Sequence, residues 1–219
     1  MNLFQIHFLC YWGTSYIFYL LDIYVYKNNI VEIYKQNKIT ERYWKYCYDS
    51  AKAALINQIL VTYPIILLLE KNIDHGYYDF KIEFLRFLLY YIFADIYFFT
   101  LHYLCHQSYF LYTKIHKFHH RVYTTSAVSA LDASPVEHAV INLGSFLIGY
   151  IIFGGHIVTI KIWVSLATIN TGIAHSGYKH FLVGKEHNIH HRLAKHNYGQ
   201  GLYILDRLLG TYILCDLKC

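Results

Sequence analysis

The sequence predicts an all-α membrane protein. We expect a polytopic helical bundle with three N-terminal spans, a later helical hairpin and a cytosolic histidine-rich site for two metal ions. Long apolar runs separate polar segments in a chain with only 15% charged residues. The longest run is broken by a pair of glycines, as expected for a hairpin. Fifteen of the 219 residues are histidine, and eight of them stand in closely spaced motifs.

The composition excludes several classes of protein. With 56% hydrophobic residues and two prolines, the chain is too apolar for intrinsic disorder. The net charge of +5 is spread over polar connections without a basic stripe, so no nucleic-acid partner is expected. The five cysteines are odd in number and scattered, which predicts reduced thiols. The sequence contains no flavin or nicotinamide fingerprint and no haem-attachment motif.

Three apolar runs predict the N-terminal spans. Residues 3–26 form the first run, which lacks a basic start and a cleavage site and is therefore not a signal peptide. Asp22 lies near its end, where a charge can reach the interface. Residues 51–69 form the second run, with a kink expected at Pro64. Residues 82–101 form the third, and we expect its helix to continue out of the bilayer.

A fourth apolar stretch, residues 139–174, predicts the hairpin. Its 36 residues would make about 54 Å of helix, slightly short of two crossings of a roughly 30 Å hydrocarbon core. Gly154 and Gly155 break it in the middle. A segment that enters the membrane and returns to its starting side is therefore expected.

The hairpin places the histidine-bearing segments before and after it on one face of the membrane. Counting back through the spans, the polar loop of residues 27–50 lies on that face too. The turn on the other side, residues 70–81, carries only Lys71 and Lys81. The excess of basic residues in the first loop predicts that the histidine face is cytosolic. These basic residues are Lys27, Lys35, Lys38, Arg42 and Lys45.

The histidine motifs predict a metal site. One H-x-x-H-H motif is expected ~0.07 times by chance in such a chain, and two are present along with one H-x-x-x-H. Residues three and four apart share a helix face, and imidazole binds iron, copper and zinc. Eight ligands exceed the needs of one tetrahedral ion, so we expect two ions. The motifs comprise His102 and His106; His116, His119 and His120; and His187, His190 and His191.

Histidines without a partner at ligand spacing are interpreted as unrelated core or surface residues. They are His7, His75, His138 and His156.

The motif series resembles the fatty acid hydroxylase/sterol desaturase superfamily, a group of histidine-rich non-haem di-iron membrane lipid oxidases. The resemblance extends beyond histidine over residues 82–213. Further matching segments are Asp95, Ser134-Pro135-Val136-Glu137, His175-Ser176-Gly177-Tyr178, Asn197-Tyr198-Gly199 and Asp206-Arg207-Leu208-Leu209-Gly210-Thr211. It implies N-terminal spans and a polar loop in residues 1–81 and a catalytic domain in residues 82–219.

The resemblance adds His175 and His180 to the ligands, and it differs from this chain at two places. Ser134 stands where relatives often have histidine. His175 and His180 are five residues apart, a turn of about 140° that separates them on a regular helix. Residues expected to support the ligands are Asp95, Glu137, His196, Asn197 and Asp206; for Asn197 and Asp206, turn and helix-cap roles are the alternative.

The resemblance implies two iron ions, O₂ as co-substrate and a membrane lipid as substrate. It leaves hydroxylation and desaturation open, and it implies an external electron donor such as cytochrome b5 or a reductase. In a eukaryote it implies the endoplasmic reticulum membrane. A catalytically inactive metal-binding membrane protein is the alternative. A metal transporter fits less well, because the histidines lie beyond the apolar runs rather than within them.

Overall fold

The computed structural model describes residues 1–36 and 38–214, apart from the side chains of residues 182–184. Every regular element in this part of the chain is helical. Cys10, Cys47 and Cys105 are free thiols, as predicted. Cys215 and Cys219 lie outside the described residues.

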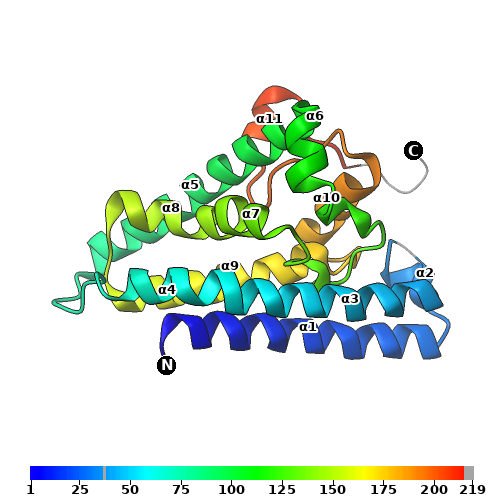
Figure 1. The fold of residues 1–219 in the computed structure, drawn as a ribbon, viewed down its shortest axis with the longest axis horizontal. Helices are drawn as coiled ribbons and strands as arrows, with labels where there is room; N and C mark the ends of the chain where they lie inside the picture. Colours follow the sequence, from blue (N-terminus) through cyan, green and yellow to red (C-terminus); the bar gives the residue numbers. More distant parts are fainter. Residues whose placement is uncertain (37, 215–219) are drawn as a thin grey trace.

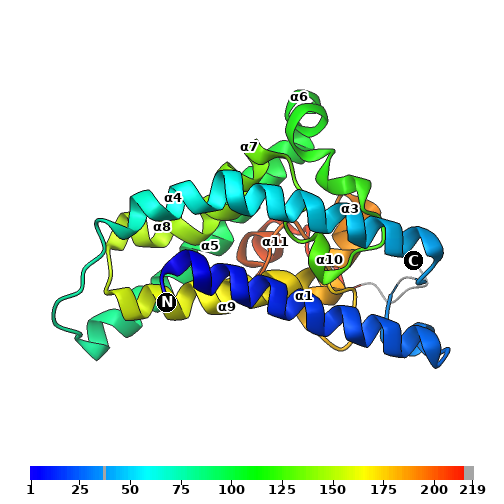
Figure 2. The same ribbon diagram turned by 60° about the horizontal axis from the view of Figure 1, so that its bottom comes forward.

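The N-terminal part forms an antiparallel pair of long helices. Helix α1 (Leu3–Lys27) leads through the short α2 (Val31–Tyr34) into α3 (Glu41–Asn57). Figure 1 shows α1 running beside α3 and its continuation. The opposite flank of α1 packs on α9 (Ile157–His175), and the two lie side by side in Figure 2.

The irregularity expected at Pro64 is a π-helical turn. Helix α3 continues through η1 (Gln58–Thr62), a π-helical segment, into α4 (Tyr63–Glu70). Proline has no N–H group to donate to the preceding turn, and its ring clashes with the carbonyl there. A wider turn just before Pro64 accommodates both effects without breaking the helix.

The second part of the chain is built around one long helix. Helix α5 (Phe80–Gln107) is the longest, and it packs against α8 (Gly144–Phe153). Figure 1 shows α5 diverging from the plane of the other long helices toward the histidine-bearing end. Gly149 of α8 allows this packing, because a Cβ atom there would stand 2.6 Å from the Tyr90 Cα of α5.

The predicted hairpin is present, with its turn at the expected glycines. Gly154 and Gly155 have φ angles of 61° and 154°, which favour glycine. The first limb runs from α7 (Pro135–Glu137) through the π-helical η5 (His138–Leu143) into α8, which ends just before these glycines. Helix α9 returns to the histidine-bearing end.

Four helices in the described part of the chain are long and apolar enough to cross a membrane, so the chain is an integral membrane protein. They are Glu41–Glu70, Phe80–Gln107, Pro135–Phe153 and Ile157–His175. The first predicted span forms α1 but is not among them. Its inner face carries polar side chains, including His7, Thr14, Ser15 and Asp22, all of which are buried against other helices.

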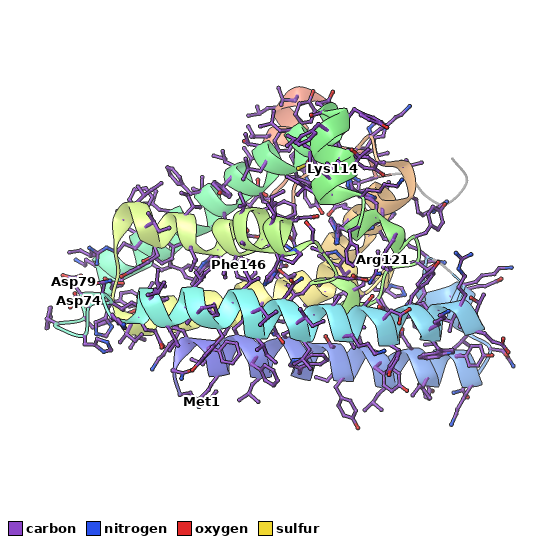
Figure 3. All side chains as sticks on the ribbon, viewed as in Figure 1. Met1, Asp74, Asp79, Lys114, Arg121 and Phe146 are labelled. Carbon is purple, nitrogen blue, oxygen red and sulfur yellow. The ribbon has the colours of Figure 1, made fainter. Side chains whose placement is uncertain are left out.

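The two ends of the bundle are closed by different contacts. At one end, the Ile157 N–H donates to the Asp74 carbonyl over 2.9 Å. At the other end, the Gln36 N–H donates to the Gly177 carbonyl over 3.0 Å. The basic loop therefore lies at the histidine-bearing end, as expected. Figure 3 shows Asp74 at one end and Arg121 toward the other. The cytosolic orientation of that end stays a prediction.

Smaller elements complete the histidine-bearing end. They are α6 (Tyr109–Leu111), η2 (Tyr112–His116), η3 (His119–Arg121), η4 (Ala127–Ser129), α10 (Leu182–Leu193) and α11 (Ile204–Leu209).

We expect Gly149→Ala to lower the free energy of unfolding by about 1–3 kcal/mol, because the new methyl group would separate α5 from α8. The control Gly13→Ala lies on an exposed part of α1 with no atom near the added Cβ. It should leave the stability unchanged or raise it by up to about 1 kcal/mol. Thermal unfolding in detergent measures both. Equal melting temperatures for the two variants would contradict the proposed α5–α8 contact.

Candidate metal centre

Four segments bring nine histidines together. Helix α5 ends with His102 and His106, one turn apart, and α9 ends with His175. The H-x-x-H-H motifs lie in the connection after α5 and on α10. Their ligand atoms form two groups, within each of which all atoms lie within 4.8 Å of one another. The five-histidine group is His102, His106, His116, His120 and His190, and the four-histidine group is His119, His175, His187 and His191.

In the five-histidine group the rings point their Nε2 atoms at a common centre. The Nε2 atom of His116 lies 3.0 Å from that of His102 and 2.9 Å from that of His106. The Nε2 atoms of His120 and His190 are 3.1 Å apart. Two nitrogens bound about 2.1 Å from one ion at right angles stand about 3.0 Å apart. The spacing therefore matches adjacent ligands of a single metal ion.

The four-histidine group has the same arrangement. The Nε2 atom of His175 lies 3.3 Å from that of His119 and 3.0 Å from that of His187. The Nε2 atoms of His187 and His191 are 3.2 Å apart. All four side chains are buried. This group is thus a second site of the same kind.

Each H-x-x-H-H motif supplies both groups. In the first motif His116 and His120 face the five-histidine group, while His119 faces the four-histidine group. On α10 the assignment reverses, since His187 and His191 belong to the smaller group. The two histidines four apart in each motif share a face, and the third points to the neighbouring group. Each motif therefore contributes possible ligand atoms to both groups.

Hydrogen bonds to Nδ1 leave several Nε2 atoms free to bind metal. The Nδ1 atoms of His119 and His175 donate to the carbonyls of Asp132 and Thr171, over 3.0 and 3.1 Å. A carbonyl oxygen only accepts, so these Nδ1 atoms carry the hydrogen and both Nε2 atoms of the neutral rings carry a lone pair. Two lone pairs facing each other at 3.3 Å are unfavourable unless a cation lies between them. The donor set thus fits a bound metal ion.

Further Nδ1 partners hold the five-histidine group. His102 donates to the Tyr198 carbonyl over 2.6 Å, and His190 donates to the His196 carbonyl over 2.7 Å. His116 Nδ1 lies 2.7 Å from Glu137 Oε1, a contact through which the carboxylate would orient this ring. The Nδ1 atoms of His187 and His191 have no hydrogen-bond partner among the described residues.

Burial keeps the imidazoles neutral. Desolvation is the largest cause that lowers the pKa of His116, and the nearby imidazoles lower it further. The pKa of each histidine on α10 is likewise held well below its usual range, first by burial and then by the neighbouring rings. Burial also lowers the pKa of His119, although the Asp132 carbonyl opposes the shift. Since only the neutral ring binds metal, the protein favours the binding form.

His180 does not belong to the ligand set, contrary to expectation. It is exposed, belongs to neither group, and packs edge-on against the ring of Tyr34, with 5.7 Å between ring centroids. The physical reason is that α9 ends at His175 and the chain leaves the helix direction before α10 begins. No regular turn carries His180 back to the site.

Asp95 does not contact an imidazole among the described residues, which corrects its expected role. Its two carboxylate oxygens accept the backbone N–H groups of Tyr203 and Ile204, over 3.1 and 2.9 Å. It thereby holds the start of α11. His196 also differs from expectation, because its backbone carbonyl rather than its ring contacts a ligand, His190.

Asp206 and Asn197 act on the ligands through the backbone. The Asp206 carboxylate accepts the N–H groups of Tyr198 and Gly199 over 2.9 and 2.7 Å. This fixes the peptide whose carbonyl binds His102. The Asn197 side chain donates to the Glu186 carbonyl of α10 over 3.2 Å. The turn around Asn197 is thus attached to the helix that carries the last motif.

Ser134 supports the site in another way. Its hydroxyl donates to the Ile115 carbonyl over 2.8 Å and accepts the Glu137 N–H over 3.2 Å. It is therefore the cap of the turn that holds Glu137 beside His116. No sequence motif indicates Asp132, whose buried carboxylate accepts from Ser50 and Arg121, both over 2.7 Å. A backbone carbonyl contact such as that of Asp132 leaves no residue signature.

An apolar cavity of about 360 Å³ lies next to the histidines. It runs between α5, α8 and α9, and its walls include Phe87, Trp163 and Leu166. A much smaller cavity adjoins it and is lined by histidines of both groups. The two cavities share Phe98, Phe146, Thr171 and Gln200 as lining residues.

Residues 87–211 match the family profile of the fatty acid hydroxylases, which covers the helices and loops that build both histidine groups. The chain belongs to the fatty acid hydroxylase family. It is 34% identical over 175 residues to fatty acid hydroxylase domain-containing protein 2 of Homo sapiens, a match that covers 74% of this chain and 51% of that protein. The chain therefore spans about half the length of this curated relative.

Two other fatty acid hydroxylase relatives carry names that state a reaction. Sphinganine C4-monooxygenase 1 of Arabidopsis thaliana is 29% identical over 76% of this chain and 71% of its own. Methylsterol monooxygenase 1 of Rattus norvegicus is 29% identical over 55% of this chain and 44% of its own. No solved structure matches the chain.

We expect the purified protein to bind about two metal ions per chain, one for each histidine group. His187→Ala should lower this to about one ion, because it removes a buried member of the four-histidine group. His180→Ala is the matched control and should keep the full content. Elemental analysis after gel filtration measures all three proteins. A loss of metal in His180→Ala would contradict the ligand set.

Glu137→Gln should weaken metal binding roughly 10–100-fold, because the charged partner of His116 is replaced by a neutral amide of the same shape. The control is Glu32→Gln, whose side chain is 81% exposed and forms an ion pair with Lys38 at the surface. Competition with a chelator measures the affinity. Equal affinities of the two variants would show that Glu137 does not support the ligand.

Proposed function

We propose that the protein is a membrane-bound, O₂-dependent lipid oxidoreductase with a histidine-ligated di-iron centre. The observation that carries this proposal is the pair of converging Nε2 groups beside an apolar cavity between membrane-spanning helices. The first feature suits a redox metal pair, and the second suits a hydrocarbon chain.

Iron fits the donor set. All nine ligands are neutral imidazoles, which suit iron, copper and zinc, whereas magnesium and calcium prefer oxygen ligands. The five-histidine group would hold one ion and the four-histidine group the other. When bound, the iron pair would supply the activation of O₂ that an unactivated C–H bond requires.

The residues of this chain supply binding, orientation and exclusion of water. The aromatic and aliphatic walls of the large cavity remove the lipid tail from water. Phe98 and Thr171 lie at the boundary between that cavity and the histidines. A tail in the cavity would therefore present a carbon to the centre while the buried rings stay dry.

The named relatives favour hydroxylation of a lipid. Both act as monooxygenases, one on sphinganine and one on methylsterols according to their names. Such a reaction consumes one O₂, two protons and two electrons for each C–H bond converted to C–OH, with one water released. The electrons must come from outside the chain, and we propose cytochrome b5 or a reductase as donor.

We further propose that the centre faces the cytosol, and in a eukaryote that the protein resides in the endoplasmic reticulum. Support comes from the basic loop at the histidine-bearing end, which carries Lys38, Arg42 and Lys45. A cytosolic electron donor could reach the centre from that side.

His119→Ala should abolish O₂-dependent lipid oxidation while leaving expression and membrane insertion intact, because it removes one buried ligand that faces His175. Comparative lipidomics of cells with wild-type protein, the variant or His180→Ala as control identifies the product. Full activity of His119→Ala would exclude the proposal. Bound metal without any oxidised lipid in the wild type would instead identify a non-catalytic metal protein.

A further inference from the structure

We propose that helix α3 holds His119 in place, so that Ser50 and Asn57 of α3 are positioning residues for the metal ion of the four-histidine group. Both residues precede residues 87–211, the part of the chain that matches the family profile. They act through a short segment of chain rather than by contact with a ring. The inference rests on the metal centre of the proposed function, but one of its tests works without metal.

One face of α3 is buried against an irregular segment. Ser50, Ala54 and Asn57 share this face because they are spaced four and three residues apart, and at most 2% of each residue is exposed. The helix packs on η4 and on the residues that follow it, where Leu131 joins Ala54 in one apolar cluster. Residues 131–133 belong to no helix or strand, so their position depends on such contacts.

The Asn57 side chain holds this segment on both sides of Asp132. Its Nδ2 atom donates to the carbonyls of Leu131 and Ala133 over 3.0 and 2.9 Å. The carbonyl between them, that of Asp132, accepts from Nδ1 of His119 over 3.0 Å. One amide group therefore uses both of its hydrogens to fix the two carbonyls next to the one that orients the ring.

Ser50 holds the same segment through the side chain of Asp132. The Ser50 hydroxyl donates to Asp132 Oδ2 over 2.7 Å, and Asp132 Oδ1 accepts from Arg121 over 2.7 Å. Because Arg121 stands two residues after His119, the carboxylate fixes the backbone of the first H-x-x-H-H motif while the carbonyl fixes one of its rings. Asp132 therefore links α3 to His119.

The four-histidine group depends on this link because its other members have few outside contacts. The Nδ1 atoms of His187 and His191 have no hydrogen-bond partner among the described residues. The Nδ1 atom of His175 donates within its own helix. His119 is thus the member whose ring is oriented by a segment that another part of the chain holds.

The five-histidine group has separate anchors. Its Nδ1 partners belong to α7 and to the loop after α10. Although α7 follows residues 131–133, its cap Ser134 donates to the Ile115 carbonyl over 2.8 Å and so attaches α7 to η2. We therefore expect a change in α3 to weaken the ion of the four-histidine group and to spare the other ion.

Metal affinity tests this expectation. Asn57→Leu keeps the size of the side chain but removes both donated hydrogen bonds. It should weaken the ion of the four-histidine group roughly 10–100-fold and leave the other ion unchanged, measured by chelator competition on the full chain in detergent. Ser50→Ala should have a smaller effect in the same direction, because Arg121 still holds Asp132.

A double variant and a control assign the effect to one group. His187→Ala alone should leave about one ion, and the addition of Asn57→Leu should not change the affinity for that ion. Gln58→Met is the matched control, since Gln58 is equally buried next to Asn57 but bonds to Trp12, and it should weaken neither ion. Equal weakening of both ions by Asn57→Leu, or the same loss in Gln58→Met, would overturn the inference.

The orientation of His119 can also be followed without metal. Diethyl pyrocarbonate modifies accessible neutral imidazoles, and mass spectrometry of peptides measures each histidine separately. In metal-free protein, His119 should react roughly 5-fold faster in Asn57→Leu and Ser50→Ala than in the wild type, whereas His102 should not change. If Asn57→Leu does not fold, Ser50→Ala decides the outcome. Unchanged reactivity of His119 in the folded variants would refute the role of α3.

The outcome is separable from that of the proposed function. A wild-type protein that binds no metal would refute the metal centre, while the reactivity of His119 would still decide the role of α3. Metal binding and lipid oxidation with unchanged reactivity of His119 in the variants would refute only the role of α3.

Discussion

The structure depends on one electrostatic constraint, the convergence of nine imidazole nitrogens on seven buried and two partly buried histidines. Desolvation disfavours the imidazolium form, and the hydrogen bonds to Nδ1 direct the remaining lone pair inward. The resulting cluster of lone pairs is unfavourable by itself, since the Nε2 atoms of His119 and His175 face each other at 3.3 Å. A bound cation would convert this repulsion into ligation, and folding and metal binding would then be coupled. Without a cation, the surrounding helices must hold the rings against their mutual repulsion.

The bundle provides that rigidity by using backbone atoms as well as side chains. The carbonyls of Tyr198 and His196 belong to a loop, yet each accepts a hydrogen bond from the Nδ1 of a clustered histidine, His102 and His190 respectively. The loop is itself fixed by Asp206, and the start of α11 by Asp95. Two carboxylates that do not touch a histidine among the described residues thus determine where histidine rings point. A loss of either charge would act on the metal site through loop geometry rather than through direct contact.

The sequence predicts the local parts of this site and misses those that depend on tertiary structure. Spacings of three and four residues fix which side chains share a helix face, so the motif histidines were identified correctly as neighbours. The prediction of His180 as a ligand is wrong because the position of His180 depends on where α9 ends, which the spacing of the histidines does not reveal. The sequence predicts a supporting role for Asp95 but not its partner, because Tyr203, whose N–H it accepts, lies 108 residues later in the chain. The Asp132 carbonyl could not be predicted, because every residue has one. The hairpin was predicted because Gly154–Gly155 breaks an apolar run locally.

The basic loop has a structural role beside the topological one that its charges suggest. Lys35 is buried rather than exposed, and its Nζ lies 2.7 Å from Asp22 of α1. The same ammonium group lies over the rings of Tyr43 and Tyr178, with 4.8 and 5.0 Å to their centroids. Removal of one partner from such a buried pair typically costs about 3–5 kcal/mol, because the other charge is left unpaired. Tyr178 follows α9 three residues after His175, so this cation–π contact attaches the N-terminal helices directly to the segment that leads from His175 to α10. The N-terminal helices therefore contribute to the geometry of the histidine-bearing end.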